Sequence, residues 1–310
     1  MQVIRDNPGR QMLQSSVLTI GNFDGLHLGH QCLINRCKEL AGDQQGDQRP
    51  VAVLTFEPLP QTWLRPEFAP SRLMSVRQKL ECLANKGVDL VWLMRFNRAL
   101  AEMGAERFVK YAVMQTLGAV DVVVGEDFHY GKGRAGNTQT LREAGNKSGF
   151  EVHAVETFEI DGVRVSSTTI REALAAGDFN RAKRFLGRPF AMQGRVIKGR
   201  RLGRQLGYPT ANMRLATEPS PLQGVFAVRT RWPGSDWRGA VASLGTRPAV
   251  GGGEFLVEVH LFDFDGDLYG RRLEVEFVEK LRDEAHFSDM DDLVAQMRED
   301  ERQARQCLRQ

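Results

Sequence analysis

A change of pattern near Leu186 divides the 310-residue chain and limits the folds open to it. Before that point, apolar runs such as VAVLTF and VDVVVG alternate with amphipathic segments such as VRQKLECLANKG. Near-continuous apolar strands separated by helices are typical of a parallel sheet with both faces covered. After that point, runs such as GVFAVRTRW and EFLVEVHLFDF follow one another with turn signals and no helix between them. This second pattern predicts an antiparallel barrel or sandwich.

The length of the chain agrees with a division into two domains, because a domain has about 150 residues as a rule. We place the boundary at Gly187, which gives domains of residues 1–186 and 187–310. One polar helix, from about Asp289 to Leu308, is expected to close the chain. The fold class is therefore α/β, with a parallel sheet in the first domain and an antiparallel β-barrel plus a terminal helix in the second.

Composition excludes several classes of protein. The chain is 42% hydrophobic and 26% charged, as in ordinary soluble globular proteins, and its net charge of +3 is too small to indicate a nucleic-acid binder. No signal peptide is recognised at the N-terminus, and no apolar stretch reaches the roughly 18 residues of a membrane span, so no membrane partner is expected. The four cysteines form no C-x-x-C pair. Their spacing argues against a zinc site or a disulfide framework and favours the cytoplasm.

The stretch GNFDGLHLGH, from Gly21 to His30, joins the apolar run SVLTIG to a helix-like segment. Such a turn lies at the carboxyl edge of a parallel sheet, where open α/β sheets bind ligands. Glycines let backbone N–H groups approach an anion, and a helix N-terminus adds a positive dipole end. His27 and His30 fall within one helical turn, so both can face one phosphate and stabilise charge during phosphoryl or nucleotidyl transfer. The alternative is a glycine-rich turn with locally bonded histidines.

A second stretch, VRVSSTTIREAL, can supply the other half of such a site. Ser166, Ser167, Thr168 and Thr169 precede a helix that carries Arg171 in its first turn. Hydroxyl and N–H groups at a helix start, together with an arginine, can hold a polyphosphate. Taken alone, the segment is also explained by a capping box formed by Thr169 and Glu172.

Together, GNFDGLHLGH, GEDFHYGKGRAG and SSTTIR resemble the nucleotidyltransferase domain of prokaryotic bifunctional riboflavin kinase/FAD synthetases. GRVIKGRRLGRQLGYPTANM and VEVHLFDFDGDLYGRRLEVEFVEKLRDE resemble the riboflavin kinase domain of the same proteins. The resemblance covers nearly the whole chain. H-x-G-H with SSTxIR marks a broad superfamily, whereas PTAN followed by DFDGDLYG is far more specific. The fold implied is a Rossmann-like nucleotidyltransferase domain followed by an antiparallel barrel.

The resemblance implies two consecutive ATP reactions on a flavin. The second domain would phosphorylate riboflavin to FMN, and the first would transfer AMP from ATP to FMN, giving FAD and pyrophosphate. The FMN phosphate is already a nucleophile, so adenylyl transfer depends on positioning and on neutralising the ATP phosphates. ATP is the implied co-substrate and Mg²⁺ the implied metal. No nucleic-acid partner is expected, and the oligomeric state is left open.

The resemblance also implies roles for residues of the first domain. His27 and His30 would contact the ATP phosphates as catalytic residues, and Ser167, Thr168 and Arg171 would hold the departing pyrophosphate. Asp127 and Phe128, from GEDF, would contribute to the flavin and nucleotide pocket. The remaining nucleotide-binding residues come from the GNFDGLHLGH turn: Gly21, Asn22, Phe23, Gly25 and Gly29.

In the second domain the resemblance assigns Thr210 and Asn212 to magnesium and the ATP phosphates. The loop KGRRLGRQLG would close over the nucleotide through the flexibility of Gly199, Gly203 and Gly207. Glu258 would accept the riboflavin hydroxyl proton, because an alcohol nucleophile gains from a nearby base. Strand alternation puts Leu256, Glu258 and His260 on one face of the strand. Alternation alone agrees equally well with a catalytic Glu258 and with a Glu258 that is merely exposed to solvent. The match with VEVHLFDF favours the catalytic role.

Other interpretations remain open for two of these segments. The basic cluster in KGRRLGRQLG could be a solvated turn or a nucleic-acid patch, but few aromatic residues accompany it. GKGRAG, from Gly131 to Gly136, fits the G-x-G-x-x-G pattern of a nicotinamide-dependent oxidoreductase, although Glu126 to Tyr130 separate it from the preceding strand. A flavin- or RNA-binding module without turnover is a further alternative.

The chain also departs from the family pattern at three positions. Leu59 stands where a histidine is common, and Ser243 and Ala249 stand where asparagine and threonine are more usual. These departures bear on a phosphate contact near Leu59 and on the flavin side of the kinase site.

Overall fold

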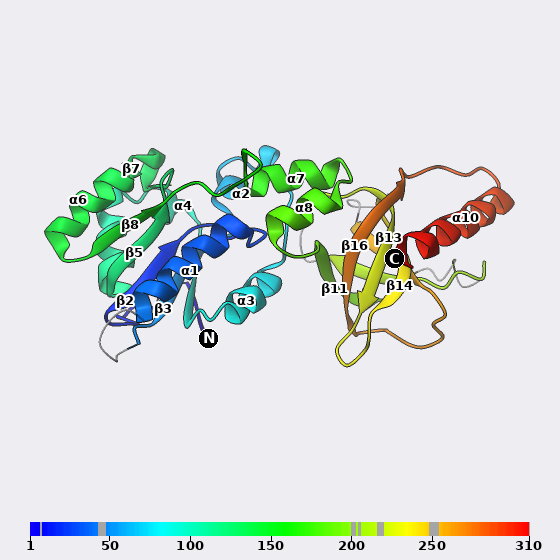
Figure 1. The fold of residues 1–310 in the computed structure, drawn as a ribbon, viewed down its shortest axis with the longest axis horizontal. Coiled ribbons are helices and arrows are strands. Elements are labelled where there is room, and N and C mark those ends of the chain that lie inside the picture. Colours follow the sequence, from blue (N-terminus) through cyan, green and yellow to red (C-terminus); the bar gives the residue numbers. More distant parts are fainter. Residues whose placement is uncertain are drawn as a thin grey trace. The chain divides into compact units, whose positions relative to one another are not determined.

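The computed structural model separates into two compact units (Figure 1). The first consists of Met1–Pro70 and Val76–Ser166, and the second of Ser71–Ser75 and Ser167–Gln310. The residues that the structure describes are 1–6, 8–42, 48–199, 203, 206–215, 220–247 and 254–309.

The first unit is built on a six-stranded sheet in the order β1-β4-β3-β2-β5-β8, and every pairing in it is parallel. This confirms the predicted parallel sheet, whose five longer strands are the apolar runs of the sequence. The edge strand β1 is not predicted by the sequence pattern, because QVIR is short and precedes turn-forming residues. The strands are β1 (Gln2–Arg5), β2 (Ser16–Ile20), β3 (Val51–Glu57), β4 (Leu90–Arg95), β5 (Ala119–Gly125) and β8 (Glu151–Val155).

Helices cover both faces of this sheet. On one face Leu18, Trp92 and Met94 join a core cluster with Phe108 and Val113 of the helical segment that follows β4. On the other face α1 packs against β2, β3 and β5. The helical elements are α1 (Leu28–Gly42), α2 (Pro60–Leu64), η1 (Pro66–Phe68), α3 (Val76–Asn85), α4 (Arg98–Ala101), α5 (Ala105–Phe108), the π-helix η2 (Val109–Thr116), η3 (Lys132–Arg134) and α6 (Thr138–Ser148).

The order of the strands reverses direction beside β2, with β3, β4 and β1 on one side and β5 and β8 on the other. Ligands of open α/β sheets bind at such a switch point, outside the carboxyl ends of the strands. The GNFDGLHLGH turn begins there at Gly21, and the GEDF segment follows the end of β5 at Gly125. Two short hairpins complete the unit: β6 (His129–Tyr130) with β7 (Gly136–Asn137), and β9 (Glu159–Ile160) with β10 (Val163–Arg164).

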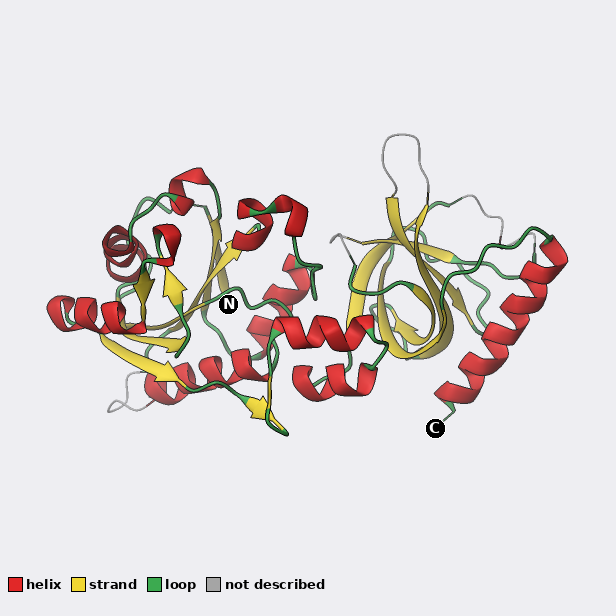
Figure 2. Cartoon of the chain, turned by 90° about the horizontal axis from the view of Figure 1, so that it is seen from above, coloured by secondary structure: helices red, strands yellow, loops and turns green. Residues whose placement is uncertain are grey.

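The second unit contains a closed barrel in the order β11-β12-β15-β14-β13-β16, and all of its pairings are antiparallel. Figure 2 shows the strands curving round on themselves. The predicted barrel is confirmed, but the sequence pattern does not predict β11 and β12. The strands are β11 (Ala191–Ile197), β12 (Ala211–Leu215), β13 (Gly224–Arg231), β14 (Arg238–Arg247), β15 (Glu254–Leu261) and β16 (Arg272–Arg282).

The helices of the second unit whose bounds fall within the described residues are α7 (Ser167–Ala175), α8 (Phe179–Leu186) and α10 (Met290–Leu308). Phe179 of α8 packs on Phe226 and Phe277 of the barrel, with ring centroids 5.9 and 6.0 Å apart. The predicted terminal helix is present, and Asp289 caps it by accepting a hydrogen bond from the Asp291 amide. None of the helices within the described ranges combines the length and apolarity needed to cross a membrane.

Candidate active sites

The turn between β2 and α1 is folded tightly against the sheet. The Gly21 amide donates a hydrogen bond to the Leu54 carbonyl oxygen over 3.1 Å. Phe23 and Leu26 are buried and have positive φ values of 48° and 42°, and Gly25 has a φ of 81°. Non-glycine residues rarely adopt this conformation, so the packing of their side chains holds the turn in one shape.

His27 is the residue before α1 and caps that helix with its side chain. Its Nδ1 accepts a hydrogen bond from the His30 amide at 3.3 Å, and its carbonyl accepts one from Gln31 at 3.0 Å. Nδ1 is therefore unprotonated, and a neutral His27 ring carries its proton on Nε2. Gly29 makes room for this arrangement, because a Cβ atom there would lie 3.2 Å from the Nδ1 of His27.

His30 lies directly against His27. The two rings are stacked with centroids 3.6 Å apart and planes inclined by 22°, and the Phe23 ring lies 5.0 Å from that of His30. Burial, the neighbouring His27 and the ammonium group of Lys79 together hold the pKa of His30 well below its usual value of 6.5. The Nδ1 atom of His30 is buried and has no hydrogen-bond partner in the part of the chain that the structure describes. The imidazole ring of His30 is therefore neutral near pH 7.

Lys79 is a residue of this site that the sequence analysis missed. It lies on α3, is 2% exposed, and its Nζ donates hydrogen bonds to the Asn22 carbonyl at 2.7 Å and the Thr55 hydroxyl at 3.4 Å. The hydroxyl of Thr55 also donates to the Asn22 carbonyl, at 3.0 Å. A positive charge is thus fixed beneath the turn. The available signal was helical spacing, since Lys79 stands four residues before the buried Leu83.

A cavity of about 720 Å³ begins at the same turn, where Gly21 and Asn22 form part of its wall. The rest of the wall is mainly apolar, and Phe128 lies in it, stacked on Tyr130 with centroids 5.5 Å apart. Asp127 is not among the lining residues: it forms an ion pair with Arg164, and its side chain is 55% exposed. Further aromatic lining residues are Phe56, Phe96 and Phe108.

The GKGRAG segment belongs to this cavity as well. Gly131, Gly133 and Arg134 line it, and η3 lies between the two strands of the β6–β7 hairpin. In a dinucleotide-binding unit the glycine-rich turn would instead join a strand of the main sheet directly to a helix. The oxidoreductase interpretation therefore lacks its structural context.

The predicted pyrophosphate contacts lie at the start of α7, in the second unit. Thr168 is exposed, and Ser167 and Arg171 are partly buried. The Nε atom of Arg171 donates a hydrogen bond to the Ser71 carbonyl at 2.5 Å, which ties α7 to the Ser71–Ser75 segment. The expected meeting of these side chains with the two histidines stays a prediction.

In the barrel, Asn212, Glu258 and Ser243 are direct neighbours on three adjoining strands, β12, β15 and β14. Asn212 is 6% exposed, and its Oδ1 is a buried oxygen without a hydrogen-bond partner among the described residues. Glu258 is partly buried, between Val257 and Val259, which are fully buried. Alternation along β15 therefore holds as predicted, and it places the Glu258 carboxylate beside the Asn212 amide.

The backbone of the predicted phosphate loop approaches Asn212 closely. A Cβ atom on Gly199 would lie 2.5 Å from the Nδ2 of Asn212, so a larger residue does not fit there. The Gly203 carbonyl accepts a hydrogen bond from Tyr208 at 2.7 Å, and Gly207 has a φ of 82°. The remaining basic residues of the loop, Arg200, Arg201 and Arg204, lie outside the described residues, as does Ala249.

Thr210 lines a cavity of about 840 Å³ at the barrel, together with Lys198. The Nδ1 of His260 bonds with the Pro209 carbonyl at 3.0 Å, which fixes the PTAN segment to β15. Residues of DFDGDLYG also line this cavity: Phe264, Asp265, Gly266, Asp267, Leu268 and Tyr269. Asn212 and Glu258 are not part of this lining.

Leu59, one of the departures from the family pattern, is 4% exposed and precedes α2. Its apolar side chain packs in the interior and has no group that could bond with a phosphate.

Two family models match the chain. The model described as FAD synthetase matches residues 9–169, and the model described as riboflavin kinase matches residues 186–308. The chain is 46% identical to the bifunctional riboflavin kinase/FMN adenylyltransferase of Pseudomonas fluorescens, with 93% of this chain and 92% of that protein covered. It is 42% identical to the protein of the same name from Escherichia coli K12, with 99% and 97% covered.

A solved structure from Streptococcus pneumoniae, titled as a macrolide-efflux protein, has the same fold over nearly its whole length. Its TM-score is 0.84 at 30% identity, and the match covers 98% of this chain and 99% of that one. The two matching family models and the full-length relatives support the interpretation as a flavin enzyme. They give no support to the interpretation as a nicotinamide-dependent oxidoreductase. The chain thus belongs to the family of bifunctional riboflavin kinase/FMN adenylyltransferases.

Proposed function

We propose that the two activities of the family use two separate sites of this chain, with ATP as co-substrate at both. Adenylyl transfer to FMN is assigned to the turn after β2, and phosphorylation of riboflavin to the barrel beside Glu258. The observation that carries the first assignment is the stacked His27–His30 pair next to an aromatic cavity of about 720 Å³. We keep the domain boundary at Gly187, with adenylyl transfer in residues 1–186 and kinase activity in residues 187–310.

At the first site the isoalloxazine ring of FMN would occupy the aromatic cavity, with Phe128 in its wall and the phosphate towards Gly21 and Asn22. A phosphate oxygen of FMN attacks the α-phosphorus of ATP, and pyrophosphate leaves. No protein base is needed, because the nucleophile is already an anion. Asp127 is retained as an outer contact of the pocket.

The histidines and Lys79 supply the electrostatics of this step. His27 can donate from Nε2, and His30 stays neutral, so that each ring can hydrogen-bond a phosphate oxygen where charge accumulates. Lys79 bonds the Asn22 carbonyl and acts as a positioning residue for the turn. Backbone groups of Phe23, Gly25 and Gly29 complete the phosphate cradle, and Ser167, Thr168 and Arg171 would hold the pyrophosphate.

At the second site Glu258 would accept the proton of the riboflavin hydroxyl as that oxygen attacks the γ-phosphorus. Thr210 and Asn212 offer uncharged oxygen atoms, and the buried Oδ1 of Asn212 lacks another partner among the described residues, which suits a hard cation. Magnesium, when bound there, would neutralise charge on the ATP phosphates. Gly199, Gly203 and Gly207 would let the loop approach the nucleotide.

The expected location is the cytoplasm, where riboflavin and ATP are both available. All four cysteines are free, which fits a reducing compartment. No nucleic-acid or membrane partner is needed for either reaction.

A time course of flavin products tests the assignment. The purified chain is incubated with riboflavin, ATP and magnesium, and flavins are separated by chromatography at intervals. FMN is expected first and FAD later, and chelation of magnesium with EDTA should stop both steps. Absence of both products would overturn the assignment, and FMN without FAD would overturn its first half.

A further inference from the structure

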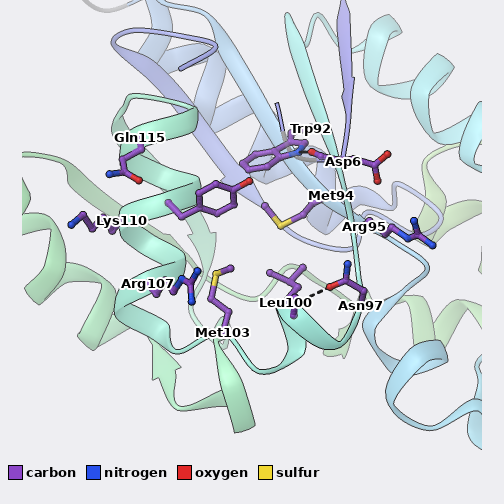
Figure 3. A pocket seen from close by; sticks show the side chains of 12 residues that line it. Asp6, Trp92, Met94, Arg95, Asn97, Leu100, Met103, Arg107, Lys110 and Gln115 are labelled. Carbon is purple, nitrogen blue, oxygen red and sulfur yellow. Dashed lines mark hydrogen bonds between the residues drawn. The ribbon is translucent and has the colours of Figure 1, made fainter. Parts of the chain in front are cut away.

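The first unit has a second cavity, of about 780 Å³, that none of the residues proposed for catalysis lines. It lies where β1 ends opposite Leu93 and leaves the last part of β4 without a neighbour on that side (Figure 3). Leu100 of α4 lines both this cavity and the proposed flavin cavity, so the two are separated by a thin wall. No other lining residue is shared.

The floor of this cavity is aromatic and rigid. Trp92 is fully buried, its Nε1 donates a hydrogen bond to the Asp6 carbonyl at 2.6 Å, and Tyr111 packs edge-on to it with centroids 5.6 Å apart. Met94 extends the apolar surface, and Figure 3 shows it beside Trp92. Fixed aromatic edges and a polarisable thioether favour a flat ring as the occupant.

The rim is cationic. Arg95, Arg107 and Lys110 are exposed lining residues, and none of their side chains forms an ion pair or hydrogen bond with any described residue. In Figure 3, Arg107 and Arg95 lie on opposite sides of Met94. Asp6 is the one carboxylate in the lining. Three long cationic side chains without partners around an apolar floor favour an anionic group at the mouth.

Lys110 and Tyr111 lie on η2, which is π-helical over Val109–Thr116. Such segments are rare and occur frequently at functional sites. The Tyr111 hydroxyl makes no hydrogen bond within the described ranges, and burial raises the pKa of this residue. The hydroxyl therefore stays protonated at neutral pH and can donate to a ligand.

We propose that this cavity is a second small-molecule site, which binds a heteroaromatic ring that carries a phosphate. The volume suits a ligand of mononucleotide size. The ring lies against Tyr111, above the floor that Trp92 and Met94 form, and the phosphate meets Arg107 and Lys110. Two sources share this chemistry, a flavin mononucleotide and an adenine mononucleotide, and the experiment separates them.

The test counts bound ligand by equilibrium dialysis of the full-length chain, with FMN and AMP as separate probes. The double variant Arg107→Glu/Lys110→Glu reverses two rim charges, and Arg142→Glu/Lys147→Glu is its control on the exposed side of α6. Wild type and control are expected to bind one equivalent more of FMN or of AMP than the rim variant binds. A difference with FMN identifies a flavin phosphate, and a difference with AMP identifies an adenine nucleotide.

A second variant tests the place of the ring without a change of charge. Ala99→Trp adds a large side chain to an exposed lining residue of the short helix α4. The Ala99→Trp variant should bind one equivalent less of the same probe than the wild type binds. Equal stoichiometries of both probes in wild type and both cavity variants would overturn the proposal. FAD formation at saturating substrates, measured on the same preparations, should stay near wild type, which keeps this result separate from the fate of the proposed active site.

Discussion

The two histidines of the GNFDGLHLGH turn have the same chemistry but different surroundings. His27 uses one ring nitrogen to cap α1, whereas His30 is stacked on it and has a buried nitrogen with no partner in the described ranges. A proton on His30 would put two cationic rings 3.6 Å apart if His27 were also charged. The fold therefore favours the neutral form of His30, which can hydrogen-bond a phosphate without a proton being lost first.

Replacement of His30 by alanine should lower FAD formation from FMN by about a hundredfold or more, the scale for loss of one transition-state contact. FMN formation from riboflavin should be unchanged, because we assign that reaction to the barrel. Both rates are read from the same chromatographic assay. An equal loss of the two activities would instead indicate misfolding or a shared site.

The pH dependence of His30 can be predicted from its surroundings. The pKa of His30 is lowered in the folded protein, so the unfolded chain takes up this proton at a higher pH. The contribution of His30 to the free energy of unfolding is complete above about pH 6.5 and is lost as the pH falls towards the folded pKa. In an NMR titration the His30 ring should therefore titrate below its usual range.

Lys79→Met should raise the pKa of His30, because it removes one of the causes of the shift. The pKa should remain below the usual value, since burial is the largest cause and is unchanged. Lys147→Met, on the exposed surface of α6, serves as the control. An unperturbed His30 in the wild type, or an identical titration in Lys79→Met, would contradict this account.

Glu258→Gln preserves size and hydrogen bonding but removes the base. FMN formation should fall by about a hundred- to ten-thousandfold. Conversion of added FMN to FAD should continue at the wild-type rate. Near-normal phosphorylation of riboflavin by this variant would refute the role of Glu258.

At this scale the sequence predicted the residues that stand in recognisable motifs and missed those that do not. His30 and Asn212 could be named from H-x-G-H and PTAN. Lys79 could not, because its contact with Asn22 joins residues 57 positions apart. A lysine within an amphipathic helix gives no sign of what its ammonium group will meet once the helix packs.

Among the secondary-structure elements, α10 contacts the residue that precedes the DFDGDLYG part of the lining of the barrel cavity of about 840 Å³. Arg305 donates two hydrogen bonds to the Asp263 carboxylate, both 2.9 Å long, and one to Glu301, and it lies over the Phe262 ring at 4.4 Å. Asp263 has a φ of 52°, which a non-glycine residue adopts at a cost. The segment that lines the cavity begins at the next residue, Phe264. Arg305 therefore holds the start of this segment.

Arg305→Met should raise the KM of the kinase for its substrates several-fold and leave FAD formation from FMN unchanged. The reason is that the Asp263 turn loses the partner that fixes it, while the cavity residues themselves are intact. Arg302→Met is a matched control, since Arg302 pairs with Glu299 on the surface of the same helix. Indistinguishable kinase kinetics in the two variants would rule out the positioning role.

Long apolar elements were predictable, and short or mixed ones were not. The buried strands β3 and β5 are nearly continuous apolar runs, and a parallel sheet follows from them. The residues of β11 and β12 mix buried with more exposed positions and include glycine, arginine and asparagine, which are equally typical of a loop. These residues form strands because they pair with β16 and β15 and so close the barrel. Such pairing between distant parts of the chain cannot be inferred from the local sequence.

For the molecule as a whole, the main question is where one domain ends and the next begins. The family models place the break between residues 169 and 186, and the change of strand pattern suggested Gly187. By packing, α7 and α8 belong with the barrel, through the contacts of Phe179 with Phe226 and Phe277. A pattern of helices and strands cannot reveal which core a connecting helix will join.

A fragment of residues 187–310 should still make FMN, because every proposed kinase residue lies within it. It should melt at a lower temperature than a fragment of residues 167–310. Loss of the Phe179 stacking costs about 0.5–1.5 kcal/mol beyond the lost burial, which corresponds to a few degrees. Calorimetry and the flavin assay on both fragments check this. A folded 187–310 fragment without kinase activity would contradict the division into two modules.

The claim that two independent sites act in sequence is tested most directly by mixing two full-length variants, each of which lacks one of the two activities. His30→Ala and Glu258→Gln are supplied with riboflavin, ATP and magnesium, first separately and then together, and the flavins are separated by chromatography. His30→Ala alone should stop at FMN, Glu258→Gln alone should leave riboflavin unchanged, and the mixture should produce FAD. A mixture that yields no FAD, although each variant is folded, would contradict the assignment of the two reactions to separate sites.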